Sequence, residues 1–111
     1  MTRGKGKNGI IPSSGNVFAD LGVSDAGEKQ TKVRLAVAIN HILEKAHVSQ
    51  VKAGQLLGIN QPKISALSNY RLHGFSVERL MNFLNSLGRD VEIVIRKRRS
   101  GRSARIHVTA A

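Results

Sequence analysis

The stretch "LGINQPKISALSNY", residues 57–70, combines a turn with the start of a short helix, and it decides the organisation of the chain. Asn60 has one of the side chains preferred at a helix N-cap, so Gln61 and Pro62 fall in the first helical turn. A proline at this position forfeits only an amide that has no partner within the helix. The stretch therefore predicts a helix that accommodates its proline without distortion.

The two sides of this helix differ in chemistry. Ile64 and Leu67 are three residues apart, and at about 100° per residue both side chains face the interior. Gln61 and Lys63 lie on the flanks. The outward positions carry small or polar side chains, namely Pro62, Ser65, Ala66 and Asn69. This outward face is available to a partner.

The preceding segment "SQVKAGQLLG", residues 49–58, is predicted to form another short helix, capped by Ser49 and ended by Gly58. Gly54 costs about 1 kcal/mol relative to alanine in a helix interior, which makes sense where another helix crosses closely. The residues expected to point inward are Ala53, Leu56 and Leu57. Two helices joined by so short a turn have the form of a helix-turn-helix, although an ordinary αα-hairpin has the same outline.

Longer amphipathic segments flank this pair. Residues 24–46 are predicted to form one helix, whose apolar stripe consists of Leu35, Ala36, Ile39, Ile42, Leu43 and Ala46. A last helix follows the capping residue Ser76, with Phe75 and Leu80 placed as a hydrophobic staple. Its buried face is expected to consist of Val77, Leu80, Met81, Leu84 and Leu87. These segments predict a mainly α-helical domain over residues 24–88.

The period changes from helix to strand in "DVEIVIRK", residues 90–97. The alternation places three apolar side chains on one side of a strand: Val91, Ile93 and Ile95. Since one strand is not stable alone, it needs a partner. Either a second strand around Ile106 and Val108 completes a short hairpin, or the same strand of a second copy pairs with it. Residues 89–111 are thus predicted to form a strand and a basic tail.

The first 23 residues are rich in Gly, Lys and Ser and have no apolar period, which predicts a flexible arm. The exception is "NVFADLG", residues 16–22, whose apolar side chains share one side of a helical turn: Val17, Phe18 and Leu21. An isolated turn is not stable in water, so this segment is expected to dock. The surface that receives it is either the chain's own core or another protein.

Charge narrows the class of partner. The chain has 18 Lys and Arg residues against 7 Asp and Glu, a formal net charge of +11. This balance favours nucleic acid over an anionic membrane surface. The sequence contains no cysteine, no apolar run long enough to span a membrane and no signal-peptide pattern. A cytoplasmic location is therefore expected.

The sequence predicts no catalysis, metal site or cofactor. His41 and His47 are six residues apart, about 240° around a helix, and no cysteine or cluster of carboxylates supports them as ligands. Ser65 lacks a neighbouring His/Asp arrangement that would make it a nucleophile. A binding protein rather than an enzyme is expected.

Taken together, these motifs resemble the XRE-like (lambda-repressor-like) DNA-binding class over about residues 25–88, and more narrowly the HigA-type antitoxins. The stretches "GNVFADLG", "LLGINQPKISAL" and "FSVERLMNFLNSLGRDVEIVI" carry the resemblance. It implies a lambda-repressor-like helical bundle with a C-terminal strand or short hairpin, used in dimerisation through Val91, Ile93 and Ile95. One departure is Gly54, where the class commonly has alanine, and slightly lower helix stability is expected from it.

The resemblance also implies a function. Such a homodimer binds a palindromic operator, represses its own operon and neutralises a RelE/HigB-type mRNA-cleaving toxin. The arm would then hold the toxin through Val17, Phe18, Asp20 and Leu21, with Asp20 suited to a basic partner. Two alternatives are a stand-alone XRE-like regulator without a toxin and a basic RNA-binding protein. The second fits poorly, because aromatic residues for base stacking make up only 4% of the chain.

By the same resemblance, the helix that begins near Gln61 enters the major groove, with its N-terminal residues near base edges. Gln61 would pair with adenine, while Pro62 and Ala66 would contact thymine methyl groups, so A·T-containing half-sites about 10 bp apart are expected. Lys63 would reach a guanine or, preferably, a phosphate. The side chains suited to phosphate contacts are Gln50, Ser65, Asn69 and Arg71. The protein would then be nucleoid-associated. Its basic C-terminal tail would add attraction to the phosphate backbone or enter the minor groove, or it would simply be solvated.

Overall fold

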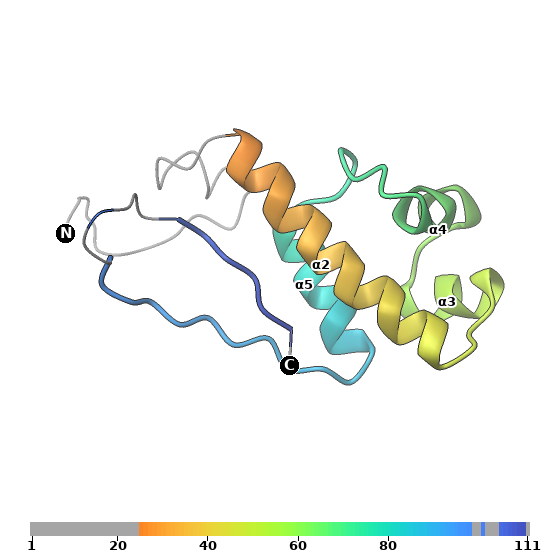
Figure 1. Cartoon of the computed structure of the whole chain (residues 1–111). Coiled ribbons are helices and arrows are strands. Elements are labelled where there is room, and N and C mark those ends of the chain that lie inside the picture. The colour runs from red at the N-terminus through yellow and green to blue at the C-terminus, as the bar shows by residue number, and fades with distance from the viewer. Residues whose placement is uncertain (1–24, 99–100, 102–104, 111) are drawn as a thin grey trace.

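The computed structural model describes residues 25–98, 101 and 105–110. The described part contains four helices, α2 (Asp25–Lys45), α3 (Gln50–Leu57), α4 (Gln61–Ser68) and α5 (Val77–Ser86). Figure 1 shows the long helix α2 lying across α5, with α3 and α4 together at one side of that pair. The predicted arm, including Val17, Phe18, Asp20 and Leu21, lies outside the described residues. No helix in the described part is long and apolar enough to cross a membrane.

One apolar core joins all four helices. The largest side chains with almost no exposed surface come from three of them: Ile39 of α2, Ile64 and Leu67 of α4, and Leu80 of α5. Ala53 and Leu57 add the inner side of α3. Burying apolar surface stabilises the fold by about 25 cal/mol per Å2, so these helices, too short to persist alone, form because they share a core.

The predicted apolar stripe of α2 is confirmed from Leu35 to Leu43 and is wrong at its C-terminal residue, Ala46. Leu35, Ala36, Ile39 and Leu43 are buried, and Ile42 is half-buried against the core. Ala46 is exposed, because α2 ends at Lys45 and the chain turns at His47, which adopts a φ of 53°. The turn is closed by a hydrogen bond of 3.1 Å from the Val48 amide to the Leu43 carbonyl oxygen.

The predicted helix caps are confirmed for the three later helices. Ser49, Asn60 and Ser76 adopt extended backbone conformations, and each side chain accepts a hydrogen bond from the amide three residues on. Pro62 lies in the first turn of α4, as its position after Asn60 predicts. Because the first four amides of a helix have no intrahelical partner, these caps define where each helix begins.

The inward prediction for Leu56 is wrong. Ala53 and Leu57 are buried, whereas 40% of Leu56 is exposed. Positions 53 and 57 are four residues apart on one helix face, and Leu56 lies about 100° around the helix from Leu57. Only one stripe of this 8-residue helix faces the core.

The predicted strand over residues 90–95 does not form within the described part of this single chain, where residues 90–98 have no regular secondary structure. Val91 and Val108 are half-buried against the core, but 74% of Ile93 and 93% of Ile95 are exposed. A strand needs a hydrogen-bonded neighbour, and no such ladder forms between these residues and the described residues near Ile106. Pairing with a second copy stays a prediction.

Candidate nucleic-acid interface

A tight turn places α4 against α3. Gly58 ends α3 in the left-handed conformation, with a φ of 70°, and its amide donates to the Gly54 carbonyl oxygen. The Ile59 amide donates to the same oxygen at 3.0 Å. Asn60 then caps α4 by accepting from the Lys63 amide at 3.0 Å. The turn therefore leaves the first turn of α4, with Gln61 and Pro62, exposed at the surface.

A hydrogen bond joins the first residues of the two helices. The Gln61 Nε2 donates to the Gln50 Oε1 at 2.6 Å, and both side chains are exposed. Gln50 thereby uses its acceptor, and Gln61 keeps one N–H group and its Oε1 available. A donor and an acceptor side by side match the N7 and the N6 amino group of adenine. Spacing alone did not predict this contact.

Beside Gln61, a shallow groove of about 290 Å3 separates α4 from the loop before α5. Pro62 and Ala66 line its α4 side, and Arg71 and His73 line its loop side. Pro62 is exposed and Ala66 is half-buried, so both present apolar surface to the groove. The sequence-predicted methyl-contacting residues are thus brought together, next to two basic side chains.

Lys63, which also lines this groove, contacts the loop before α5. Its Nζ donates to the Gly74 carbonyl oxygen at 3.3 Å and lies 5.1 Å from the centre of the Phe75 ring. The cation–π contact and the hydrogen bond hold the half-buried side chain against the loop. In this conformation Lys63 links α4 to that loop.

The predicted phosphate-contacting residues differ in freedom. Asn69 follows α4, and its Nδ2 donates to the Ser65 carbonyl oxygen at 2.8 Å, so its donor serves the helix end. Ser65 is half-buried. Arg71 is exposed, and its backbone amide is anchored to the Ala66 carbonyl oxygen at 2.8 Å. Arg71 is the charged residue of the three, and its side chain forms no ion pair within the described residues.

Asn40 of α2 was not singled out by the sequence, yet it holds α4 in place. Its side chain is only 7% exposed, and its Nδ2 donates to the Leu67 carbonyl oxygen at 3.1 Å. That carbonyl is one of the last four of α4, which lack partners within the helix. A polar residue directly beside Ile39 in an apolar stripe is the signal that could have identified it.

The basic side chains near α3 and α4 are not neutralised by acidic neighbours within the described residues. Within the described residues one ion pair forms, between Lys32 Nζ and Glu28 at 3.5 Å on α2. In the same part of the chain, Lys52, Lys63 and Arg71 have no acidic partner. Nor do the described residues contain a group of three His, Cys, Asp or Glu side chains that would hold a metal ion.

Comparisons with known proteins agree with this geometry. Residues 17–96 match the family model described as "Helix-turn-helix domain". A solved structure titled "Putative XRE Family Transcriptional Regulator" is 61% identical, with a TM-score of 0.76, and the match covers 79% of this chain and 100% of that one. No curated protein matches. The chain therefore belongs to the XRE-like helix-turn-helix family of DNA-binding transcriptional regulators.

Proposed function

We propose that this regulator represses its own operon by binding a palindromic operator, with α4 in the major groove. The observation that carries the proposal is the bond between Gln61 and Gln50 at the exposed start of α4. It fixes one N–H group of Gln61 and leaves the remaining donor and acceptor free for adenine. A glutamine held in this way loses less side-chain entropy when it meets a base.

Residues around Gln61 make the remaining contacts with DNA in this proposal. Pro62 and Ala66, on the groove beside Gln61, contact thymine methyl groups. Gln50, at the capped start of α3, and Arg71 contact phosphates and fix the register on the duplex. Ser65 and Asn69 of the same helix end add phosphate contacts. Lys63 contributes by holding the loop before α5 through its bond to Gly74.

A second copy supplies the other half-site in this proposal. The exposed apolar side chains of Ile93 and Ile95, together with Val91, pair with the same segment of the partner. Two half-sites about 10 bp apart follow from such a dimer. Arg96, Lys97 and Arg98, all exposed, then add attraction to the phosphate backbone.

Binding of the full chain to the DNA upstream of its own gene tests the proposal. Fluorescence anisotropy at about 0.15 M salt compares that duplex with a scrambled duplex of the same composition. A preference of about a thousandfold or more is expected for a specific site. Equal affinity for both duplexes, or tighter binding to RNA, would overturn the assignment.

We infer further that the protein is an antitoxin, whose arm neutralises a RelE/HigB-type toxin through Val17, Phe18, Asp20 and Leu21. Support comes from the sequence alone, in which large apolar side chains interrupt a polar arm. An arm that orders on its target spends conformational entropy at that moment, and it can cover an active site while the domain stays on DNA.

Co-purification with the product of the neighbouring gene tests the antitoxin inference. Deleting residues 1–22 is expected to abolish co-purification while operator binding survives. Deleting residues 1–15 is the matched control, because it keeps "NVFADLG" and should keep the toxin. A toxin retained by the longer deletion would refute the arm as the interface. No complex with the full chain would support a stand-alone regulator.

A further inference from the structure

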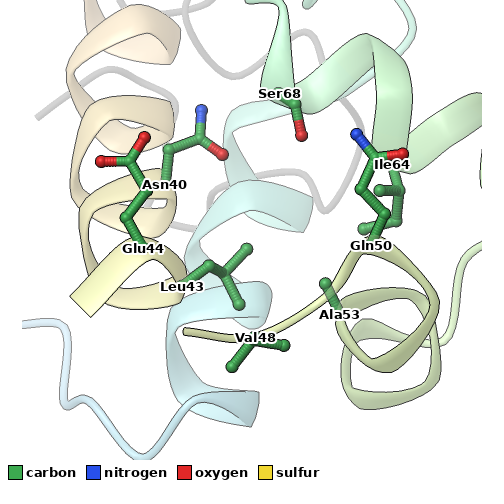
Figure 2. Close-up of a pocket in the computed structure, with 8 residues that line it drawn as sticks. All are labelled: Asn40, Leu43, Glu44, Val48, Gln50, Ala53, Ile64 and Ser68. Carbon is green, nitrogen blue, oxygen red and sulfur yellow. The ribbon is translucent and has the colours of Figure 1, made fainter. Parts of the chain in front are cut away.

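A pocket of about 120 Å3 lies where α2, α3 and α4 meet, behind the bond between Gln50 and Gln61. Leu43, Val48 and Ala53 form its apolar floor, and Asn40, Gln50 and Ser68 contribute polar groups. Figure 2 shows the amide oxygen of Asn40, the hydroxyl of Ser68 and the amide nitrogen of Gln50 directed toward the same space.

The amide oxygen of Asn40 is the unusual group in this pocket. The side chain is 7% exposed, and its one hydrogen bond within the described residues is donated by Nδ2 to Leu67. A buried carbonyl oxygen without a donor costs about 1–3 kcal/mol. The Gln50 Nε2 faces the pocket with its N–H groups, since the Oε1 of that amide accepts from Gln61.

We propose that this pocket is a site for an ordered water that joins Asn40 to Gln50. The water donates to the Asn40 Oδ1 and accepts from the Gln50 Nε2, and Ser68 Oγ is its third partner. The pocket has room for a water, since its volume of about 120 Å3 is several times the roughly 15 Å3 that one water requires. Three polar partners are within the usual number for a structural water. Glu44 also lines the pocket, and its carboxylate disfavours an anion such as a phosphate oxygen there.

The water makes Asn40 a positioning residue for base recognition, an inference that rests on the proposed function. Asn40 fixes the end of α4 directly through Leu67 and fixes Gln50 through the water. Gln50 in turn fixes Gln61, which lies at the start of the same helix. Both ends of α4 are therefore tied by hydrogen bonds to one side chain of α2.

Ser68→Val tests the site without removing Asn40. Ser68 is the exposed last residue of α4, and a valine there fills the pocket with methyl groups while the Asn40–Leu67 bond remains. Ser86→Val is the matched control, because Ser86 is the exposed last residue of α5 and does not line the pocket. Both variants carry the same change in helix propensity, and a cooperative thermal unfolding transition in each shows that both fold.

Two readouts decide the proposal. In a high-resolution crystal structure of the full chain, a water is expected within about 3.2 Å of both Asn40 Oδ1 and Gln50 Nε2. In anisotropy, Ser68→Val should lower the ratio of upstream to scrambled affinity about fivefold, as for one lost hydrogen bond. Its salt dependence should stay that of wild type, because no phosphate contact is removed. Ser86→Val should leave the ratio unchanged.

Absence of the water from the crystal structure, or an unchanged ratio in Ser68→Val, would overturn the proposal. A wild-type protein that does not prefer its upstream DNA would instead refute the proposed function. The crystal structure would still decide whether the water site exists in that case.

Discussion

Gly54 lies where α3 approaches the turn and the first part of α4. A methyl group on its Cα would lie 2.9 Å from the Ile59 carbonyl oxygen and 3.5 Å from Ile64 Cγ1. The first distance is too short for a carbon–oxygen contact, and a backbone oxygen cannot rotate away as a side chain can. This close approach explains why a helix-weakening glycine occupies the crossing.

Gly54→Ala is expected to lower the free energy of unfolding by about 1 kcal/mol. Overpacking costs about 1–3 kcal/mol, and the alanine recovers about 1 kcal/mol of helix propensity. Urea denaturation measures the difference. Gln55→Ala, at the next and exposed position of α3, is the control and should change little. A stabilised Gly54→Ala protein would show that the turn has more room than its geometry indicates.

At the scale of elements, α4 depends on its ends. It has 8 residues, and helices this short do not persist in water without caps and packing. Asn60 caps its first turn, while Asn40 and Asn69 bind carbonyl oxygens near its last turn. Helix α4 is thus held by three asparagine side chains in addition to its buried face.

Asn60→Ala is expected to destabilise the protein by about 1 kcal/mol, because the Lys63 amide loses its acceptor. Thermal unfolding followed by circular dichroism measures this loss. Asn60→Ser, which keeps an acceptor at the N-cap, should stay close to wild type. Equal losses in the two variants would mean that the amide contact is not what holds the start of α4.

Much of the helical part could be predicted from sequence because caps and apolar spacing are local signals. Ser49, Asn60 and Ser76 mark their helices correctly. Spacing places Leu56 about 100° around the helix from Leu57, but which of the two positions faces the core depends on how the helices pack.

In the candidate site, too, local spacing predicts the position of a residue on its helix but not its contacts with other elements. The position of Gln61 on its helix follows from spacing, but its bond to Gln50 joins side chains eleven residues apart. The attachment of Lys63 to Gly74 and of Asn40 to Leu67 likewise depends on packing between elements.

At the scale of the whole molecule, the C-terminal segment is the part of the described chain least covered by its own core. Ile93 is 74% exposed and Ile95 is 93% exposed, in a segment that the sequence predicts to be a strand. Exposed strand-forming residues with unpaired backbone groups are templates for pairing with another chain. The single chain thus leaves available the surface that a dimer requires.

Replacing both residues, as Ile93→Glu together with Ile95→Glu, is expected to convert a dimer into a monomer. Like charges across a paired strand and the loss of apolar contact both oppose association. Analytical ultracentrifugation of wild type and variant at equal concentration measures the mass. Glu substitutions at Val33 and Val37, exposed on α2, are the control and should leave the dimer intact. A wild type that sediments as a monomer would contradict the predicted dimerisation.

The central claim is that Gln61, held by Gln50, reads an A·T base pair. The most direct measurement is the affinity of Gln61→Ala for the upstream duplex and for duplexes with each base pair exchanged in turn. We expect a loss of about 1–3 kcal/mol on the wild-type duplex and no remaining discrimination at one A·T pair of each half-site. Gln55→Ala, an exposed glutamine on α3, should bind like wild type. Undiminished discrimination at every position in Gln61→Ala would contradict the account.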